Sequence, residues 1–261
     1  MCGIAGFLKQ NKQSKVDARA VSEMFSDAQR SGKDSSGIYL EFARKSPILY
    51  KQMGSIDNLL SLSKVRQDIS TATMGLAHTR QSSMGLIDLN NCQPFKVGKY
   101  VMLHNGHIWN LGDAKRSDSK ELASKLDAKG FWGIKGYLDN GWANIVVYNT
   151  KTKRLVLSVD PNIPRLYTEV YYGVLYFASE REWLPSFCKN SKMLNQTKEY
   201  IVGKKQCMIL VNYRTKRPTT PSWNSYNTYS TTKYPETMRH SLGGELLTHK
   251  EYQSLLNGWK T

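Results

Sequence analysis

The chain opens with MCGIAGF, residues 1–7, in which a cysteine stands directly behind the initiator methionine. Because Cys2 is small, an aminopeptidase can remove Met1 and leave Cys2 as the N-terminal residue. The thiol then titrates at about 8.5 and the α-amine at about 7.7–8.0 in reference peptides, so the amine can accept the thiol proton without a histidine. The stretch therefore predicts an N-terminal nucleophile. From these residues alone, an equally good interpretation is that Cys2 is a small residue at the start of a buried strand.

Length and composition favour a soluble globular protein. The 261 residues, 40% of them hydrophobic, are enough for one large domain or two small ones. The cysteines, Cys2, Cys92, Cys188 and Cys207, show no CxxC spacing, which argues against a zinc site or a disulfide framework and fits a reducing compartment. The chain has no signal-like start and no apolar run of about 18 residues. We therefore expect a cytoplasmic protein with no metal, no cofactor and no membrane contact.

The net charge of +16 is the most unusual feature of the composition. Such a field attracts nucleic acid, a phosphorylated substrate or an acidic partner protein. The charges are spread along the chain, however, and no block of five or six like charges occurs. A solvated basic surface is the favoured interpretation, and a nucleic-acid partner is only weakly supported.

The spacing of apolar residues predicts three helices before the middle of the chain. Ser14 and Asp17 are candidate caps for the first helix, Ser117 caps the third, and Gly130 is expected to stop it. The predicted helices cover residues 14–30, 56–67 and 117–130.

Strands outnumber helices in the predicted structure. In SGIYLEFAR, residues 36–44, Ile38, Leu40 and Phe42 alternate with polar or small residues, which predicts a half-buried strand. The segment TKTK, residues 150–153, separates two apolar runs as a hairpin turn does. Strands are expected at 3–9, 36–44, 48–52, 73–80, 100–106, 141–149, 154–160, 174–179 and 206–213. Sheets covered by helices indicate the α+β class.

The composition changes at about Arg214. The following residues are rich in Thr, Ser, Asn, Tyr and Pro and lack periodicity, which is typical of an extended surface segment. Thr248 and Glu251 form a capping-box pattern that predicts a short terminal helix. We therefore expect a main domain at 2–213 and a C-terminal extension at 214–261.

Behind Cys2 stand four motifs that are weak singly and specific in this order. They are SGKDSSG (31–37), HTRQSSMGLIDLNNCQPF (78–95), HNGHIWN (104–110) and SDSKELA (117–123). From Cys2 to about Tyr213 the chain resembles the class II glutamine amidotransferase domains, which are N-terminal-nucleophile hydrolases. The resemblance implies a four-layer αββα sandwich followed by a C-terminal extension.

The resemblance also implies a catalytic role for three residues. Cys2 attacks the side-chain amide of glutamine to form a thioester, and its α-amine acts as general base and then protonates the departing ammonia. The Asn105 side chain and the Gly106 N–H bind the oxyanion. Taken alone, Asn105-Gly106 is more typical of a type I′ turn between two strands.

The substrate-binding residues implied by the resemblance are Arg80, Asp118 and Ser83. Arg80 matches the arginine that binds the α-carboxylate of glutamine, and Asp118 matches the carboxylate that binds the α-ammonium. An alternative for Asp118 is an ordinary residue at a helix start. His78 and His104 are expected to be structural, because the mechanism already has its base.

Two departures from the family pattern bear on activity. Ser31 stands where the family has an arginine before the glycine of the DSSG motif, and Gln81 follows the pocket arginine where an aromatic residue or leucine is usual. The leading hypothesis is a stand-alone glutaminase subunit that supplies ammonia to a separate, synthetase-type acceptor subunit. The alternatives are an amidohydrolase for another amide and a binding or structural module without activity.

Overall fold

The computed structural model describes residues 2–160, 162, 165–202, 207–209, 240–242 and 245–247. The chain divides into two compact units, Met1–Thr215 and Lys216–Thr261. The second unit contributes one described feature, an antiparallel pair of strands, β14 (His240–Leu242) and β15 (Glu245–Leu247).

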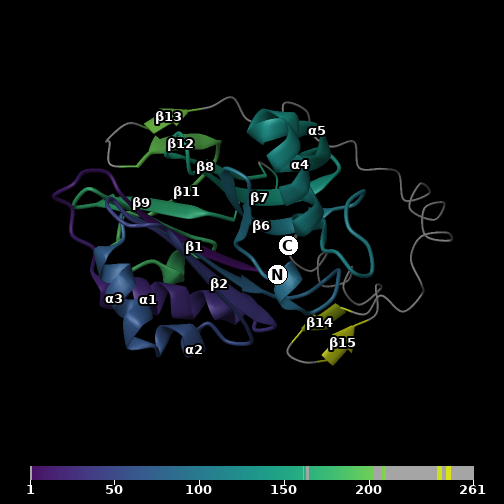
Figure 1. The fold of residues 1–261 in the computed structure, drawn as a ribbon, viewed down its shortest axis with the longest axis horizontal. Coiled ribbons are helices and arrows are strands. Elements are labelled where there is room, and N and C mark those ends of the chain that lie inside the picture. The colour runs from purple at the N-terminus through teal and green to yellow at the C-terminus, as the bar shows by residue number, and fades with distance from the viewer. Residues whose placement is uncertain are drawn as a thin grey trace. The chain divides into compact units, whose positions relative to one another are not determined.

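Two antiparallel sheets form the body of the first unit (Figure 1). The seven-stranded sheet has the order β11-β9-β10-β1-β4-β2-β3, and the six-stranded sheet has the order β13-β12-β8-β7-β6-β5. The strands of the first sheet are β1 (Gly3–Lys9), β2 (Ser35–Glu41), β3 (Ile48–Met53), β4 (Met74–Arg80), β9 (Tyr167–Tyr171), β10 (Val174–Ala178) and β11 (Lys192–Met193). Those of the second are β5 (Phe95–Val97), β6 (Tyr100–Ile108), β7 (Gly141–Asn149), β8 (Arg154–Ser158), β12 (Lys198–Ile201) and β13 (Cys207–Ile209).

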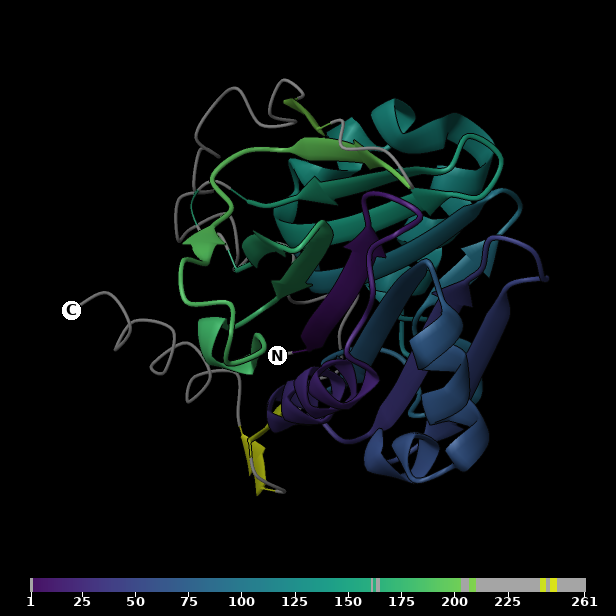
Figure 2. The same cartoon turned by 90° about the vertical axis from the view of Figure 1, so that its left-hand side faces the viewer.

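Helices cover the outer face of each sheet (Figures 1 and 2). On the seven-stranded sheet they are α1 (Ala18–Asp27), α2 (Asp57–Leu60) and α3 (Ser63–Thr71), and on the six-stranded sheet α4 (Asp118–Gly133) and α5 (Lys135–Leu138). Three apolar clusters fill the spaces between these layers: one under α1–α3, one between the sheets, and one under α4 and α5. The predicted α+β class and four-layer αββα arrangement are confirmed.

The prediction that 36–44 is half-buried is wrong, because every residue of β2 is buried. Ile38 and Leu40 pack in the cluster under the helices, whereas Tyr39 packs in the cluster between the sheets. A strand in the inner layers of a four-layer fold has a core on both faces, so its alternation does not mark a solvent face.

The helix predicted at 56–67 is two helices, α2 and α3. Leu62 between them is extended, with φ −71° and ψ 121°. The Arg66 guanidinium donates to the carbonyl oxygens of Leu60 (2.6 Å) and Ser61 (2.8 Å). A side chain from the second helix thus satisfies the carbonyls that the first helix leaves open at its end.

The predicted helix caps are confirmed in part. The carboxylate of Asp17 accepts the N–H groups of Arg19 and Ala20 at the start of α1, whereas the Ser14 hydroxyl bonds to Asn11 and Gly173 instead. Ser117 caps α4. Gly130 has non-helical dihedrals, with φ +71° and ψ 176°, so the first helical segment of α4 ends there as predicted, and a second segment continues beyond this kink to Gly133.

Several predictions about the C-terminal part lie outside the described residues. The expected terminal helix falls on residues 248–261, and β13 covers three residues of the strand expected at 206–213. The boundary at Arg214 stays a prediction. No described helix combines the length and apolarity that crossing a membrane requires.

Candidate active site

Cys2 stands at the start of β1, in the middle of the seven-stranded sheet. Strand β1 pairs with β4 on one side and β10 on the other, and Gly3 pairs with Thr79. This register sets Cys2 beside Arg80, the last residue of β4. A Cβ on Gly3 would collide with the carbonyl oxygen of Ala28, so the glycine behind Cys2 lets the η1 turn (Ala28–Ser31) approach the strand.

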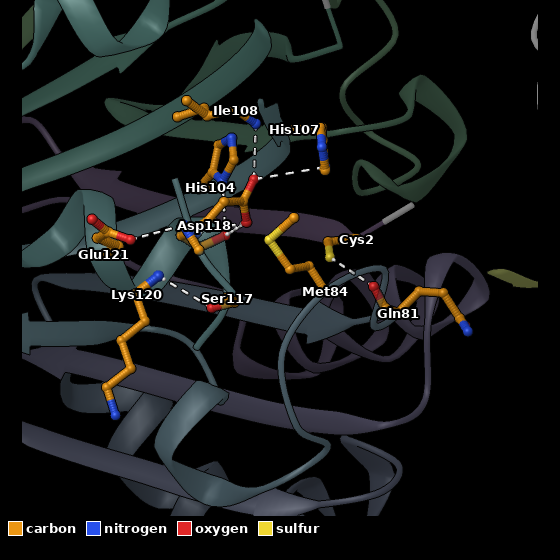
Figure 3. A network of polar contacts seen from close by, with 12 residues as sticks. Cys2, Gln81, Met84, His104, His107, Ile108, Ser117, Asp118, Lys120 and Glu121 are labelled. Atoms are coloured by element: carbon orange, nitrogen blue, oxygen red, sulfur yellow. Dashed lines mark hydrogen bonds and ion pairs between the residues drawn. The ribbon is translucent and has the colours of Figure 1, made fainter. Parts of the chain in front are cut away.

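Cys2 connects the two sheets through its backbone. Its N–H donates to Asn105 Oδ1 at 3.1 Å. Its Sγ lies 3.6 Å from the carbonyl oxygen of Gln81 (Figure 3). Burial raises the pKa of the Cys2 thiol, and the positive charge of Arg80 opposes this shift. The thiol is therefore held protonated at neutral pH, and chemistry at sulfur requires a base close by.

Asn105 and Gly106 lie inside β6, so the turn interpretation is wrong. They pair with Asn144 and Ala143 of β7 in the regular antiparallel register. Because Asn105 Oδ1 accepts the N–H of Cys2, its amide nitrogen is directed away from that contact as a donor. A Cβ on Gly106 would collide with the carbonyl oxygen of Trp142, which explains glycine at this position.

Arg80 is buried, and its guanidinium holds the loop that follows β4. Its Nη1 donates to the carbonyl oxygen of Leu86 at 2.9 Å and its Nη2 to that of Met84 at 2.7 Å. A guanidinium has five N–H donors, so these two bonds do not exhaust it. On the same loop Ser83 is exposed, whereas Met84 is buried against Gly112.

Asn91 fastens this loop to the segment before α4. Its Nδ2 donates to the carbonyl oxygens of Leu86 (3.1 Å) and Lys115 (2.9 Å), and its Oδ1 accepts the N–H of Ser117 at 2.8 Å. Gly85, at φ +75°, lies so close to Ser117 that a Cβ would meet its backbone nitrogen at 2.5 Å. Loop 81–91 is therefore closed against the α4 side of the site.

Asp118 is the first residue of α4, and its carboxylate is fixed on both oxygens (Figure 3). Oδ2 accepts the N–H of Ile108 at 2.9 Å, and Oδ1 accepts the N–H of Ser119 at 2.6 Å and its hydroxyl at 3.2 Å. His104 Nδ1 lies 2.8 Å from the same hydroxyl. Asp118 is thus both a helix-start residue and a buried, oriented negative charge beside Cys2.

His78 and His104 are buried and neutral. Burial lowers the pKa of His78 to about 3 and also lowers the pKa of His104. His78 Nε2 lies 3.2 Å from the carbonyl oxygen of His104, and His104 contacts Ser119. These contacts agree with the structural role predicted for both residues.

The DSSG motif contacts the first residues of loop 81–91 through Asp34. Asp34 accepts the N–H of Ser82 at 2.7 Å and donates its own N–H to the carbonyl oxygen of Arg80 at 2.9 Å. Arg30 pairs with Asp27 at the surface, 2.7 Å away. Arg30, which directly precedes Ser31, therefore makes its ion pair with Asp27 and not with a residue of the site. Within the described residues no cluster of three or more potential metal ligands occurs.

No protein-family model matches the chain, but the curated relatives include two kinds of enzyme. The glutamine–fructose-6-phosphate aminotransferase (isomerizing) of Gluconobacter oxydans is 29% identical over 130 residues, which are 50% of this chain and 19% of that protein. Human amidophosphoribosyltransferase is 29% identical over 94 residues, 34% of this chain and 18% of that protein. The chain thus spans about a fifth of the length of these relatives.

Solved structures share the fold. Glutamine PRPP amidotransferase from B. subtilis has a TM-score of 0.60 at 16% identity, over 82% of this chain and 50% of that one. A glutamine aminotransferase class-II domain protein from Silicibacter pomeroyi has a TM-score of 0.52 at 13% identity, over 80% of this chain and 99% of that one. The resemblance to class II glutamine amidotransferases is confirmed. The N-terminal-nucleophile hydrolase fold that it implied is confirmed as well.

This amidotransferase-like site contains residues that the motifs did not single out. Asn91 lies within the motif 78–95, but nothing in the sequence distinguishes it from its neighbour Asn90. His107 and Met84 also lie within quoted motifs, and only the fold places both of them at Asp118. The only sign in the sequence that these residues belong to the site is that each is a polar or bulky residue standing between residues of a quoted motif.

Proposed function

We propose that this protein is a glutamine amidotransferase that hydrolyses the side-chain amide of glutamine and donates the ammonia. One contact carries the proposal: the Cys2 backbone nitrogen lies 3.1 Å from Asn105 Oδ1. It brings the candidate nucleophile and oxyanion donor together from opposite sheets. Buried charges of opposite sign, Arg80 and Asp118, act on the same thiol.

In the proposed reaction Met1 has been removed and Cys2 carries a free α-amine. The amine takes the thiol proton, and the thiolate attacks the amide carbon of glutamine. Asn105 Nδ2 and the Gly106 N–H stabilise the tetrahedral oxyanion. The amine then gives its proton to the leaving ammonia, and water hydrolyses the remaining thioester to glutamate.

Substrate selection follows from the charges of a free amino acid. We assign the α-carboxylate to Arg80, helped by Ser83 when the loop rearranges around substrate, and the α-ammonium to Asp118. A peptide-bound glutamine lacks both charges. Binding would leave the Arg80 and Asp118 charges buried without the opposite charges of a free amino acid, which is costly.

We further propose that residues 2–213 form the amidotransferase domain and that the acceptor is a separate synthetase-type subunit in the cytoplasm. Ammonia in neutral water is mostly protonated and no longer nucleophilic, so direct transfer to a docked acceptor is an advantage. Affinity purification of the full chain from its native source tests this. Recovery of no ammonia-using enzyme would contradict the separate acceptor while leaving the glutaminase proposal intact.

The glutaminase proposal is tested by ammonia release from glutamine together with intact mass. We expect active protein to lack Met1, and Cys2→Ala to abolish hydrolysis while melting at the wild-type temperature. The analogue 6-diazo-5-oxo-norleucine should add covalently to Cys2 and not to the Cys2→Ala protein. Full activity with Met1 retained would contradict the mechanism, because the base would then be part of a peptide bond.

A further inference from the structure

His107 lies beside Asp118 without a hydrogen bond between them. Its Nδ1 is 4.0 Å from Asp118 Oδ2, and the two side chains are 17% and 6% exposed (Figure 3). The ring also packs edge-on against Trp109, with centroids 4.3 Å apart. His107 is therefore held in place by its surroundings while its nitrogen faces the carboxylate across a gap.

The width of this gap matches one primary ammonium group. An N–H donor lies about 2.9 Å from its acceptor. At a nitrogen that far from both Nδ1 and Oδ2, the two acceptors subtend about 90°, roughly 20° less than the angle between two N–H bonds, which a slight bend in each hydrogen bond accommodates. One –NH3+ group can therefore donate to both atoms.

The hydrogen bonds that Asp118 already accepts do not use the side of Oδ2 that faces His107. Oδ2 receives the Ile108 N–H, and Oδ1 receives the two donors of Ser119. A carboxylate has roughly four lone-pair sites, so Oδ2 can accept one more donor. The carboxylate is positioned but not saturated.

We infer that His107 is a substrate-recognition residue, whose neutral Nδ1 accepts a hydrogen bond from the α-ammonium of glutamine together with Asp118. The inference rests on the proposed function and extends it to a residue outside the assigned set. It requires the tautomer with the proton on Nε2.

The electrostatic surroundings keep the ring in the required form. Burial lowers the pKa of His107, and the Asp118 charge opposes this. The titratable groups that face the ring are Asp118 of α4 and His104 of its own strand, which is itself buried and neutral. The paired strand β7 carries only Tyr148, which lies in the cluster between the sheets. At neutral pH the ring therefore accepts, whereas a protonated ring would repel the ammonium.

Calorimetry on Cys2→Ala protein tests the inference without turnover. The ligands are L-glutamine and glutaramic acid, which is glutamine without its α-amino group. Adding His107→Leu should weaken glutamine binding roughly ten- to hundred-fold, the effect of losing a hydrogen bond to a charged group, and should leave glutaramic acid binding unchanged. His107→Asn should retain most of the glutamine affinity, because its Oδ1 stands near the position of Nδ1.

Acidification provides the second measurement. In the Cys2→Ala protein, glutamine affinity should fall about tenfold per pH unit below the pKa of His107, and the added His107→Asn substitution should remove that component. If His107→Leu lowered the affinity for both ligands equally, or for neither, the His107 inference would be overturned while the glutaminase proposal stands. If the Cys2→Ala protein bound neither glutamine nor glutaramic acid, both the His107 inference and the glutaminase proposal would be overturned.

Discussion

At the scale of single residues, burial sets the chemistry of the histidines in β4 and β6. His78 is fully buried, its Nε2 faces a carbonyl oxygen, and its Nδ1 has no partner among the described residues. The folded state therefore takes up no second proton at this ring until the pH approaches about 3. In the unfolded chain the same ring titrates near about 6.5.

This difference predicts acid destabilisation with a defined sign. Between about pH 6.5 and 3 the unfolded state carries one more proton at His78, so the free energy of unfolding falls as pH falls, by up to about 1.4 kcal/mol per unit. Above about 6.5 the contribution is constant. Urea denaturation at pH 7, 6, 5 and 4 should show this slope in the wild type and a smaller one in His78→Gln. Parallel slopes would show that other groups account for the acid sensitivity.

At the scale of elements, loop 81–91 is the segment on which the site depends most. Arg80 holds it from within, and Asn91 fastens it to the segment before α4. These bonds join residues that are up to 26 positions apart. The closed position of loop 81–91 therefore depends on a few polar contacts of Arg80 and Asn91, and single substitutions can remove the contacts of each residue separately.

Asn91→Ala should open this loop. The substitution leaves the buried N–H of Ser117 without its acceptor, which costs about 1–3 kcal/mol, and we expect faster amide hydrogen exchange across residues 82–90. The KM for glutamine should rise about tenfold, since the cost of ordering the loop then falls on substrate binding. Asn90→Ala is the matched control, because Asn90 is exposed and contacts only Asp88, at 3.4 Å, among its described bonds. Equal effects of the two substitutions would contradict the role of Asn91 in fastening loop 81–91 to the segment before α4.

At the scale of the whole first unit, a second tie joins the two sheets at the end remote from the site. Glu41, at the end of β2, accepts the hydroxyl of Tyr39 at 2.6 Å and pairs with Lys153 of the β7–β8 turn at 2.7 Å. Ser35, at the other end of β2, pairs with Arg80. The two ends of β2 are six residue-to-residue steps apart, which is about 20 Å in a strand.

Glu41→Leu should therefore lower stability without altering the chemistry. It leaves the Tyr39 hydroxyl buried and unpaired, at a cost of about 1–3 kcal/mol. Glu41→Gln keeps an acceptor and removes only the ion pair, whose lysine is half-exposed, so its loss should be under about 1 kcal/mol. Urea unfolding measures both, and glutaminase activity per folded molecule should be unchanged. A selective fall in kcat for Glu41→Leu would show that the two ends of the sheet are coupled.

Local chemistry was sufficient for much of the fold, whereas the candidate site residues were assigned from the family resemblance. Apolar periodicity predicted α1, α4 and the long strands, because each signal lies within about ten residues. The caps Asp17 and Ser117 act on backbone groups two or three positions away. The order of the motifs behind Cys2 predicted the family, and the fold places Arg80, Asn105 and Asp118 near Cys2. Short strands such as β9 and β12 escaped prediction, because their pairing with neighbouring strands forms them and their own sequence does not.

The sequence by itself determined which chemical groups are present. A thiol behind Met1, an arginine at the end of a predicted strand and a carboxylate at a helix start can each be read from single positions. Only the tertiary structure decided what they face. Asn105 is 103 residues from Cys2, and whether Asn105-Gly106 is a turn or a strand interior depends on its pairing with β7. Likewise the two-sided burial of β2, the closure by Asn91 and the 4.0 Å gap at His107 arise where separate layers meet. Packing brings these groups together through contacts between distant positions, which no local pattern encodes.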